Sequence, residues 1–89
     1  MRLALALLCL FCLLHAGNSA LYCSQCKTTV QTAETKGCSD SECMAPIIMS
    51  SCSFDETCAG TLYNFMNSLA ACSRLNGAPA TCCASLALC

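Results

Sequence analysis

The sequence predicts a small disulfide-rich domain behind a removable leader, because a short chain combines many cysteines with one strongly apolar N-terminal run. The chain has 89 residues, 12 cysteines and 56% hydrophobic residues, but only 10% charged residues and a formal net charge of −1. A chain of this size buries too little apolar surface to offset the entropy lost on folding. The composition therefore indicates one domain that depends on covalent cross-links.

Residues 1–20 have the features of a secretory signal peptide. Arg2 supplies the positive start, and residues 3–14 form an uninterrupted apolar run. This run is too short for a membrane anchor, which needs about 20 residues, and has the length of a signal sequence. The C-terminal residues lack the pattern that directs glycolipid anchoring. We therefore expect a mature domain over residues 21–89 that is secreted, extracellular and has no direct membrane anchor.

The cysteines of the mature domain are expected to form five disulfides. Two of the 12 cysteines, Cys9 and Cys12, lie in the predicted signal, which leaves an even number. Thiols in an oxidising compartment pair with one another. The expected disulfide cysteines are Cys23, Cys26, Cys38, Cys43, Cys52, Cys58, Cys72, Cys82, Cys83 and Cys89. Cys23 and Cys26 also have zinc-ligand spacing, but the export signal and the even count argue against a metal site.

The mature domain lacks side chains that catalysis usually needs. Its sequence contains no histidine, since the only one, His15, lies in the predicted signal. Catalytic triads, cysteine–histidine pairs and histidine metal centres are therefore excluded. We expect no enzyme activity, no catalytic residues, no cofactor and no metal. With Arg2 removed, three basic residues face five acidic ones, so nucleic-acid binding and membrane lysis, which favour a basic surface, are disfavoured.

The first half of the mature domain is expected to contain short strands. Residues 21–30 alternate Tyr, Thr and Val with polar residues, as in a half-exposed strand, and residues 32–42 have loop composition. Pro46 disfavours a helix interior or a central strand, so a strand is expected over residues 47–52. The two isoleucines after the proline are expected in the core, and Phe54 is expected to pack against the disulfides.

The second half of the mature domain leaves two structures open. Residues 59–72 fit either one amphipathic helix or two short strands with a bend at residues 66–68. The helical stripe consists of Leu62, Phe65, Met66 and Leu69. Asn76-Gly77 is the strongest two-residue signal for a β-hairpin. The residues alone therefore allow a β fold or a helical or mixed cysteine-stapled scaffold.

Three cysteine motifs resemble those of the three-finger superfamily, which includes snake neurotoxins, lymphocyte-antigen and urokinase-receptor proteins, and secreted pheromones. The motifs are Leu21-Tyr22-Cys23-Ser24-Gln25-Cys26, Cys52-SFDET-Cys58, and Cys82-Cys83 followed by five residues and Cys89. The resemblance spans the mature domain and implies a mainly β three-finger fold. It places finger I within residues 24–51, finger II at 59–71 and finger III at 73–81.

The resemblance also implies a pairing of the cysteines. Four pairs follow the family pattern, namely Cys23 with Cys58, Cys26 with Cys38, Cys52 with Cys72, and Cys83 with Cys89. The family usually has a further cysteine after the position of Cys72, but none lies between Cys72 and Cys82. The cysteine pattern is therefore non-standard, and the remaining pair is expected to be Cys43 with Cys82.

A disulfide scaffold holds surface loops in one conformation, so little entropy is lost when a partner binds. We therefore expect a secreted ligand or modulator, toxin-like or pheromone-like, that binds an extracellular protein or a membrane receptor ectodomain. The predicted contact residues are Tyr63, Phe65, Met66, Arg74 and Leu75. The alternatives are a helical disulfide-rich venom or defence peptide, or a structural secreted protein that self-associates through the apolar residues 44–49.

Overall fold

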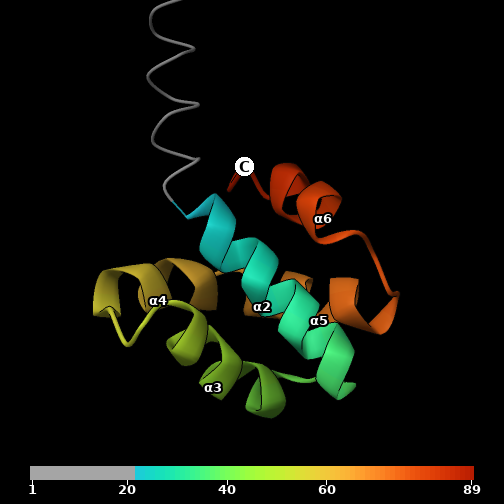
Figure 1. Ribbon diagram of the computed structural model, residues 1–89, viewed down its shortest axis with the longest axis horizontal. Coiled ribbons are helices and arrows are strands. Elements are labelled where there is room, and N and C mark those ends of the chain that lie inside the picture. Colours follow the sequence, from blue (N-terminus) through green and yellow to red (C-terminus); the bar gives the residue numbers. More distant parts are fainter. Residues whose placement is uncertain (1–21) are drawn as a thin grey trace, which may run out of the picture.

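A computed structural model describes residues 22–89, and these residues form α-helices and no strand (Figure 1). The helices are α2 (Cys23–Lys36), α3 (Ser41–Ser51), α4 (Glu56–Tyr63), α5 (Met66–Arg74) and α6 (Pro79–Ser85). The expected mainly β three-finger fold is therefore wrong, and the helical cysteine-stapled alternative is confirmed. The predicted signal peptide lies outside the described residues.

A helix, α2, forms where residues 21–30 suggested a strand. Its buried residues recur at the spacing of one helical face, and they are Cys26, Thr29, Val30 and Ala33. Burial of this face outweighs the strand preference of Thr and Val, which depends strongly on context. The buried hydroxyl of Thr29 donates a hydrogen bond to the Gln25 carbonyl at 2.8 Å, so the polar atom is satisfied within the helix.

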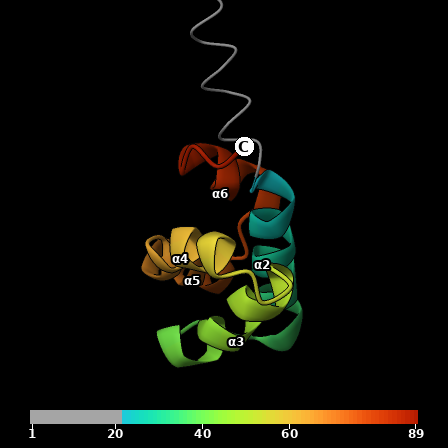
Figure 2. The same ribbon diagram turned by 90° about the vertical axis from the view of Figure 1, so that its left-hand side faces the viewer.

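The central helix is α2, which packs against α3, α5 and α6, whereas α4 packs mainly on α3 (Figures 1 and 2). A short connection joins α2 and α3 into a helical hairpin. Gly37 ends α2 in the left-handed conformation, with φ of 67°. Asp40 then caps α3, because its carboxylate accepts a hydrogen bond from the Cys43 N–H at 2.8 Å. Only residues 37–40 of the predicted loop at 32–42 lie outside helices.

Pro46 lies inside α3, although its presence led us to expect a strand after it. A proline removes the hydrogen bond to the carbonyl four residues earlier, here that of Glu42. Glu42 is exposed and lies in the first turn of α3, where water can bond this carbonyl. Pro46 is itself exposed, and the opposite face of α3 buries Met44, Ile47 and Ile48. The expected core position of the two isoleucines is confirmed.

Residues 59–72 are helical, but they belong to two helices rather than one. Because α4 ends at Tyr63 and α5 begins at Met66, the helical stripe is interrupted at its middle. Leu62 and Leu69 are fully buried, whereas Phe65 and Met66 at the break are half-buried and pack against the core. The helical periodicity therefore identified the buried face correctly.

Asn76-Gly77 ends α5 instead of turning a β-hairpin. Asn76 has φ of 54°, and its N–H donates to the Ser73 carbonyl at 3.1 Å. The Gly77 N–H donates to the Cys72 carbonyl at 3.0 Å, which completes the hydrogen-bond pattern of a Schellman motif. Asparagine readily adopts the left-handed conformation both in a β-hairpin turn and at the end of a helix. The dipeptide alone therefore did not distinguish the two structures.

Each of the ten cysteines in the described part of the chain forms a disulfide, but none of the predicted pairs is present. The observed pairs are Cys23–Cys89, Cys26–Cys83, Cys38–Cys43, Cys52–Cys58 and Cys72–Cys82. The predicted Cys26–Cys38 pair shows why the family pattern fails. The helix α2 rises about 15 Å from Cys26 to its end at Lys36, two residues before Cys38, and a disulfide spans at most about 7 Å between Cα atoms. The Cys43–Cys82 pair fails because Cys43 joins Cys38 beside it, at the start of α3.

Candidate partner-binding surface

The predicted contact residues lie at the two ends of α5 and do not form one patch. Tyr63, Phe65 and Met66 surround the α4–α5 junction, whereas Arg74 and Leu75 lie where α5 ends. A helix rises about 12 Å from Met66 to Arg74, so the two groups are separated by most of a helix length. Their role in binding stays a prediction, and the structure assigns them to two different surfaces.

Of the three predicted residues at the α4–α5 junction, two lie at the edge of the hydrophobic core. Phe65 and Met66 are half-buried, and both pack against the buried cluster. Tyr63 is 37% exposed and lies at the last position of α4. Of the three, Tyr63 therefore offers the most accessible side chain to a partner.

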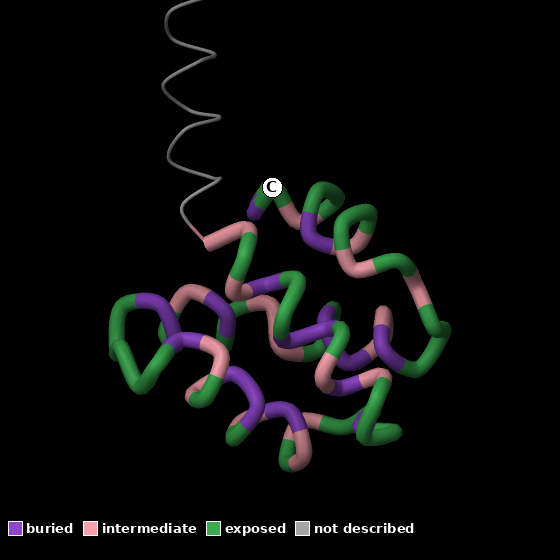
Figure 3. Tube along the Cα trace, viewed as in Figure 1, coloured by how far each residue is buried: buried purple, intermediate pink, exposed green. Residues whose placement is uncertain are grey.

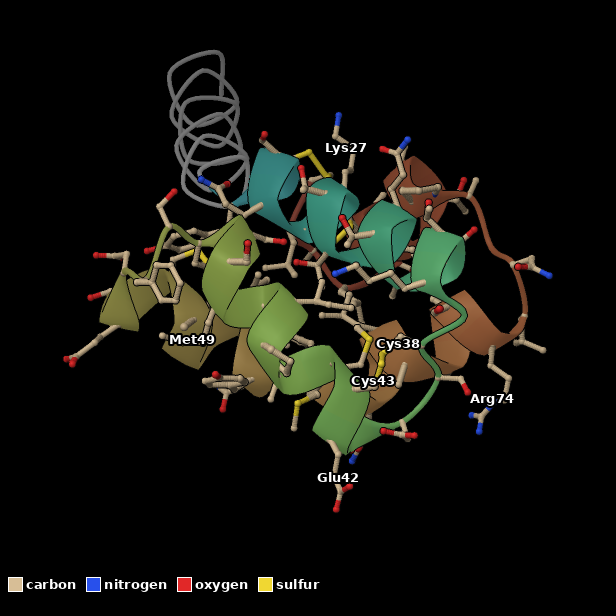
Figure 4. All side chains as sticks on the ribbon, turned by 60° about the horizontal axis from the view of Figure 1, so that its bottom comes forward. Lys27, Cys38, Glu42, Cys43, Met49 and Arg74 are labelled. Carbon is tan, nitrogen blue, oxygen red and sulfur yellow. A yellow bond between two sulfur atoms is a disulfide. The ribbon has the colours of Figure 1, made fainter. Side chains whose placement is uncertain are left out.

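The corner formed by Arg74 and Leu75 is more exposed. Leu75 is 78% exposed, and Arg74 is also exposed and extends from the end of α5 (Figure 4). The Cys72–Cys82 disulfide and the Schellman motif at Asn76 and Gly77 hold this corner. The positive charge of Arg74 also stabilises the C-terminal end of α5, where the helix dipole is negative. The exposed charge therefore has a structural explanation, but the exposed leucine has none.

A second exposed corner, which the sequence did not predict, lies between α3 and α4. Phe54 was expected to pack against the disulfides, but it is 72% exposed. The segment Ser53–Asp55, which we call the α3–α4 tip, is enclosed by the Cys52–Cys58 disulfide. It lies on the opposite side of the molecule from the α5–α6 connection, and Figure 3 colours the tip and most of that connection as exposed.

The backbone of the tip is unusual. Ser53 and Phe54 are consecutive non-glycine residues with positive φ, 52° and 62° respectively. The left-handed conformation costs an ordinary residue about 1–2 kcal/mol, and a bulky residue adopts it rarely. The Ser53 conformation follows from the end of α3, where the Ser53 and Phe54 N–H groups donate to the Ser50 and Met49 carbonyls at 3.1 and 2.9 Å. These two bonds form a Schellman motif, which requires only its first residue to be left-handed.

The ends of the other helices show what is different about Phe54. The same hydrogen-bond pattern ends α2 at Gly37, α5 at Asn76 and α6 at Ala87. The residue after the left-handed position commonly makes an apolar contact back to the helix. That residue is buried after α2 and α6, where it is Cys38 and Leu88. At the end of α3 the equivalent position holds a phenylalanine that faces solvent.

The chain on both sides of the tip carries only negative charge. Residues 37–73 include no lysine, arginine or histidine, and their charged residues are Asp40, Glu42, Asp55 and Glu56. Asp55 adjoins Phe54 and caps α4, since its carboxylate accepts a hydrogen bond from the Cys58 N–H at 2.9 Å. This bond fixes the chain on one side of Phe54, and the end of α3 fixes it on the other. An exposed aromatic ring is thus held next to negative charge on an immobilised turn.

Within residues 22–89 there is no cluster of side chains suited to a metal ion, and no helix is both long and apolar enough to cross a membrane. The described cysteines are consumed in disulfides, so none offers a thiolate. Comparisons of the chain with protein-family models, curated proteins and solved structures found no significant match. Any functional assignment therefore depends on the surface of the molecule itself.

Proposed function

We propose that this chain is a secreted, helical, disulfide-rich peptide of the venom or defence kind, which acts without catalysis by binding an extracellular protein. The observation that carries the proposal is the exposed, left-handed Phe54 at the α3–α4 tip. Five disulfides support action in an oxidising compartment, and the predicted signal supports secretion.

The tip is energetically unfavourable in the free protein, which supports a role in binding. Burying a phenylalanine side chain contributes about 1.5–3 kcal/mol, and an exposed ring forgoes most of this. Its backbone conformation costs a further 1–2 kcal/mol or so. Non-glycine residues in such conformations concentrate at sites that bind ligands. A partner that buried the Phe54 ring would regain the free energy that its exposure forgoes.

The surroundings of Phe54 indicate the chemistry of the partner. Aromatic side chains that fill an apolar pocket are frequent anchors of protein interfaces. The neighbouring carboxylates of Asp55 and Glu56 favour a partner whose pocket is bordered by lysine or arginine. Because the tip is held by a disulfide, a helix end and an N-cap, little conformational entropy is lost when it binds.

The apolar segment 44–49 does not support the self-association alternative. Met44, Ile47 and Ile48 are buried in the core, so they offer no exposed apolar patch to a second copy. The exposed large apolar side chains among the described residues are Phe54, Tyr63 and Leu75. Binding to a different protein through the tip is therefore the better supported function.

The test is a binding screen of the secreted, fully disulfide-bonded protein against a panel of purified receptor ectodomains, measured by biolayer interferometry. For an ectodomain that binds, Phe54→Ala should weaken the affinity by about 30-fold or more, as expected for a central anchor. Added salt should slow association, because it screens the acidic residues of the tip.

The matched control is Leu75→Ala, which removes the other strongly exposed apolar side chain on the opposite side of the molecule. It should change the affinity less than twofold. An ectodomain that responds to Leu75→Ala and not to Phe54→Ala would place the binding surface at the α5–α6 corner and refute the tip. Absence of binding to every ectodomain in the panel would argue against a receptor ligand altogether.

A further inference from the structure

A groove runs along the hairpin of α2 and α3, on a different surface from the tip. Its volume is about 330 Å³, which is within the range of small-molecule sites. One wall comes from α2 and carries Thr28, Thr32 and Lys36, spaced four residues apart. Residues with this spacing lie on one face of a helix, so the wall extends about 12 Å along the helix axis.

The second wall comes from α3 and is mostly apolar. Pro46, which is exposed, and Ile47, which is largely buried, line its centre, and Ser50 lies further along the helix. The hairpin reverses the chain, so Lys36, next to the connection, lies at the end of the groove where α3 begins. Thr28 and Ser50 lie toward the other end. The groove therefore has a cationic end, an apolar middle and hydroxyl groups along its sides.

Lys36 is the only charged residue that lines this groove. Lys36 is exposed and lies in the last turn of α2. The nearest acidic residue of α3, Glu42, does not line the groove and projects away from α2 in Figure 4. The structural role of Lys36 is to complement the negative end of the α2 dipole, and this role leaves its ammonium group accessible to an anion.

We infer that the α2–α3 groove binds a small amphiphilic carboxylate, with its acid group at Lys36 and its apolar chain along Pro46 and Ile47. A carboxylate would gain a charge-assisted hydrogen bond from the ammonium group. The threonine and serine hydroxyls can donate to or accept from polar atoms along the chain. The inference is independent of the tip, because none of the tip residues lines the groove.

Decanoate, kept at concentrations where it is monomeric, is a suitable probe for the full disulfide-bonded protein. A titration followed by amide chemical shifts should saturate, with shifts centred on Thr28, Thr32, Lys36 and Ile47. Decyl alcohol should bind at least threefold more weakly, because it has the same chain and no negative charge. Shifts that centre on Phe54 or Leu75 would overturn the inference.

Two lysines of α2 provide a matched pair of variants. Lys36→Met should weaken decanoate binding at least threefold and leave decyl alcohol binding unchanged. Lys27→Met is the control, because Lys27 projects from α2 away from α3 (Figure 4) and lines a separate depression between α2 and α6. Equal weakening by both variants would show general electrostatic attraction and refute the site.

A third variant tests the groove without changing charge. Ser50 is exposed, so Ser50→Tyr should fold and fill the groove, which should abolish decanoate binding. Unchanged thermal unfolding would confirm that the variant is folded. Vesicles of anionic lipid form the last arm of the experiment. Binding to vesicles without saturable binding of monomeric decanoate would identify a membrane-surface interaction and overturn the inference.

Discussion

The two ends of this molecule are held by the same chemistry in different ways. At one end, Cys23–Cys89 and Cys26–Cys83 join the start of α2 to the C-terminal segment, across sequence separations of 66 and 57 residues. We call this end the clamp. At the α3–α4 tip, Cys52–Cys58 closes a separation of only six residues. The clamp therefore restricts the whole unfolded chain, whereas the tip disulfide restricts one turn.

The clamp is also more deeply buried than the tip. Cys26 and Cys83 are fully buried, and Leu88 beside the clamp is buried as well. At the tip, Phe54 is exposed and lies between two acidic or polar neighbours. The comparison indicates a division of roles, in which the clamp supplies global stability and the tip uses local cross-linking to display a side chain.

Removal of the clamp should have the largest effect. In the chain-entropy model, a loop the size of that closed by Cys26–Cys83 contributes about 4 kcal/mol, and one the size of Cys52–Cys58 about 2 kcal/mol. Because the clamp disulfides are nested, either one still closes the long loop when the other is replaced. Single clamp pairs replaced by alanine should each cost about 3 kcal/mol, and both together about 7 kcal/mol.

The measurement is urea unfolding followed by far-UV circular dichroism. Loss of both clamp disulfides removes an amount comparable to the total stability of a small domain, so this variant should be largely unfolded. A Cys38→Ala/Cys43→Ala variant is the control and should remain folded. If the variant without both clamp disulfides unfolded cooperatively near the urea midpoint of the native protein, the clamp would not be the source of global stability.

Two glycines, one beside the Cys72–Cys82 disulfide and one inside α4, should respond oppositely to alanine. At Gly77, an added Cβ would lie 2.8 Å from the sulfur atoms of both Cys72 and Cys82, so the disulfide or the backbone must shift. Gly77→Ala should destabilise the protein by about 1–3 kcal/mol. At Gly60, inside α4 and near the tip, an added Cβ meets no atom within 4 Å. Gly60→Ala should stabilise the protein by about 0.5–1 kcal/mol through helix propensity.

Thermal unfolding of the two variants under non-reducing conditions distinguishes them by the sign of the change in Tm. A higher Tm for Gly77→Ala would show that close packing against Cys72–Cys82 is not what requires glycine at position 77, and a lower Tm for Gly60→Ala would contradict the open environment of Gly60. The two variants also report how closely the chain is packed at the α5–α6 connection and on the surface of α4.

Three features could be predicted from the sequence: the disulfide-rich class of the domain, the isoleucines of the core and the buried side of residues 59–72. The sequence did not allow the helical fold or the disulfide pairing to be predicted, because cysteine spacing along the chain does not reveal which helix ends meet in space. Helix signals were nevertheless present, since Asp40 and Asp55 each precede by three residues the amide that they cap. The family resemblance and Pro46, however, favoured strands over helices.

The candidate binding residue was missed for a different reason. Nothing in the amino-acid types distinguishes Phe54 from a core phenylalanine, because aromatic residues are usually buried. Its exposure arises from two successive left-handed residues after α3, a backbone path that depends on where α4 starts. By contrast, Arg74 and Leu75 were recognisable as exposed because they adjoin the asparagine and glycine that end α5.

The smallest expected effect concerns the tip and separates its backbone from its side chain. Phe54→Gly relieves the left-handed backbone, and the gain exceeds the added flexibility of the unfolded chain, so we expect stabilisation of about 0.5–1 kcal/mol. Phe54→Ala keeps the backbone cost and removes an exposed ring, so its stability should stay within about 0.5 kcal/mol of the native protein. Both variants should lose the ectodomain binding described above. Destabilisation by both would instead show that the ring packs on the fold, and the tip would then be a structural turn with no need of a partner.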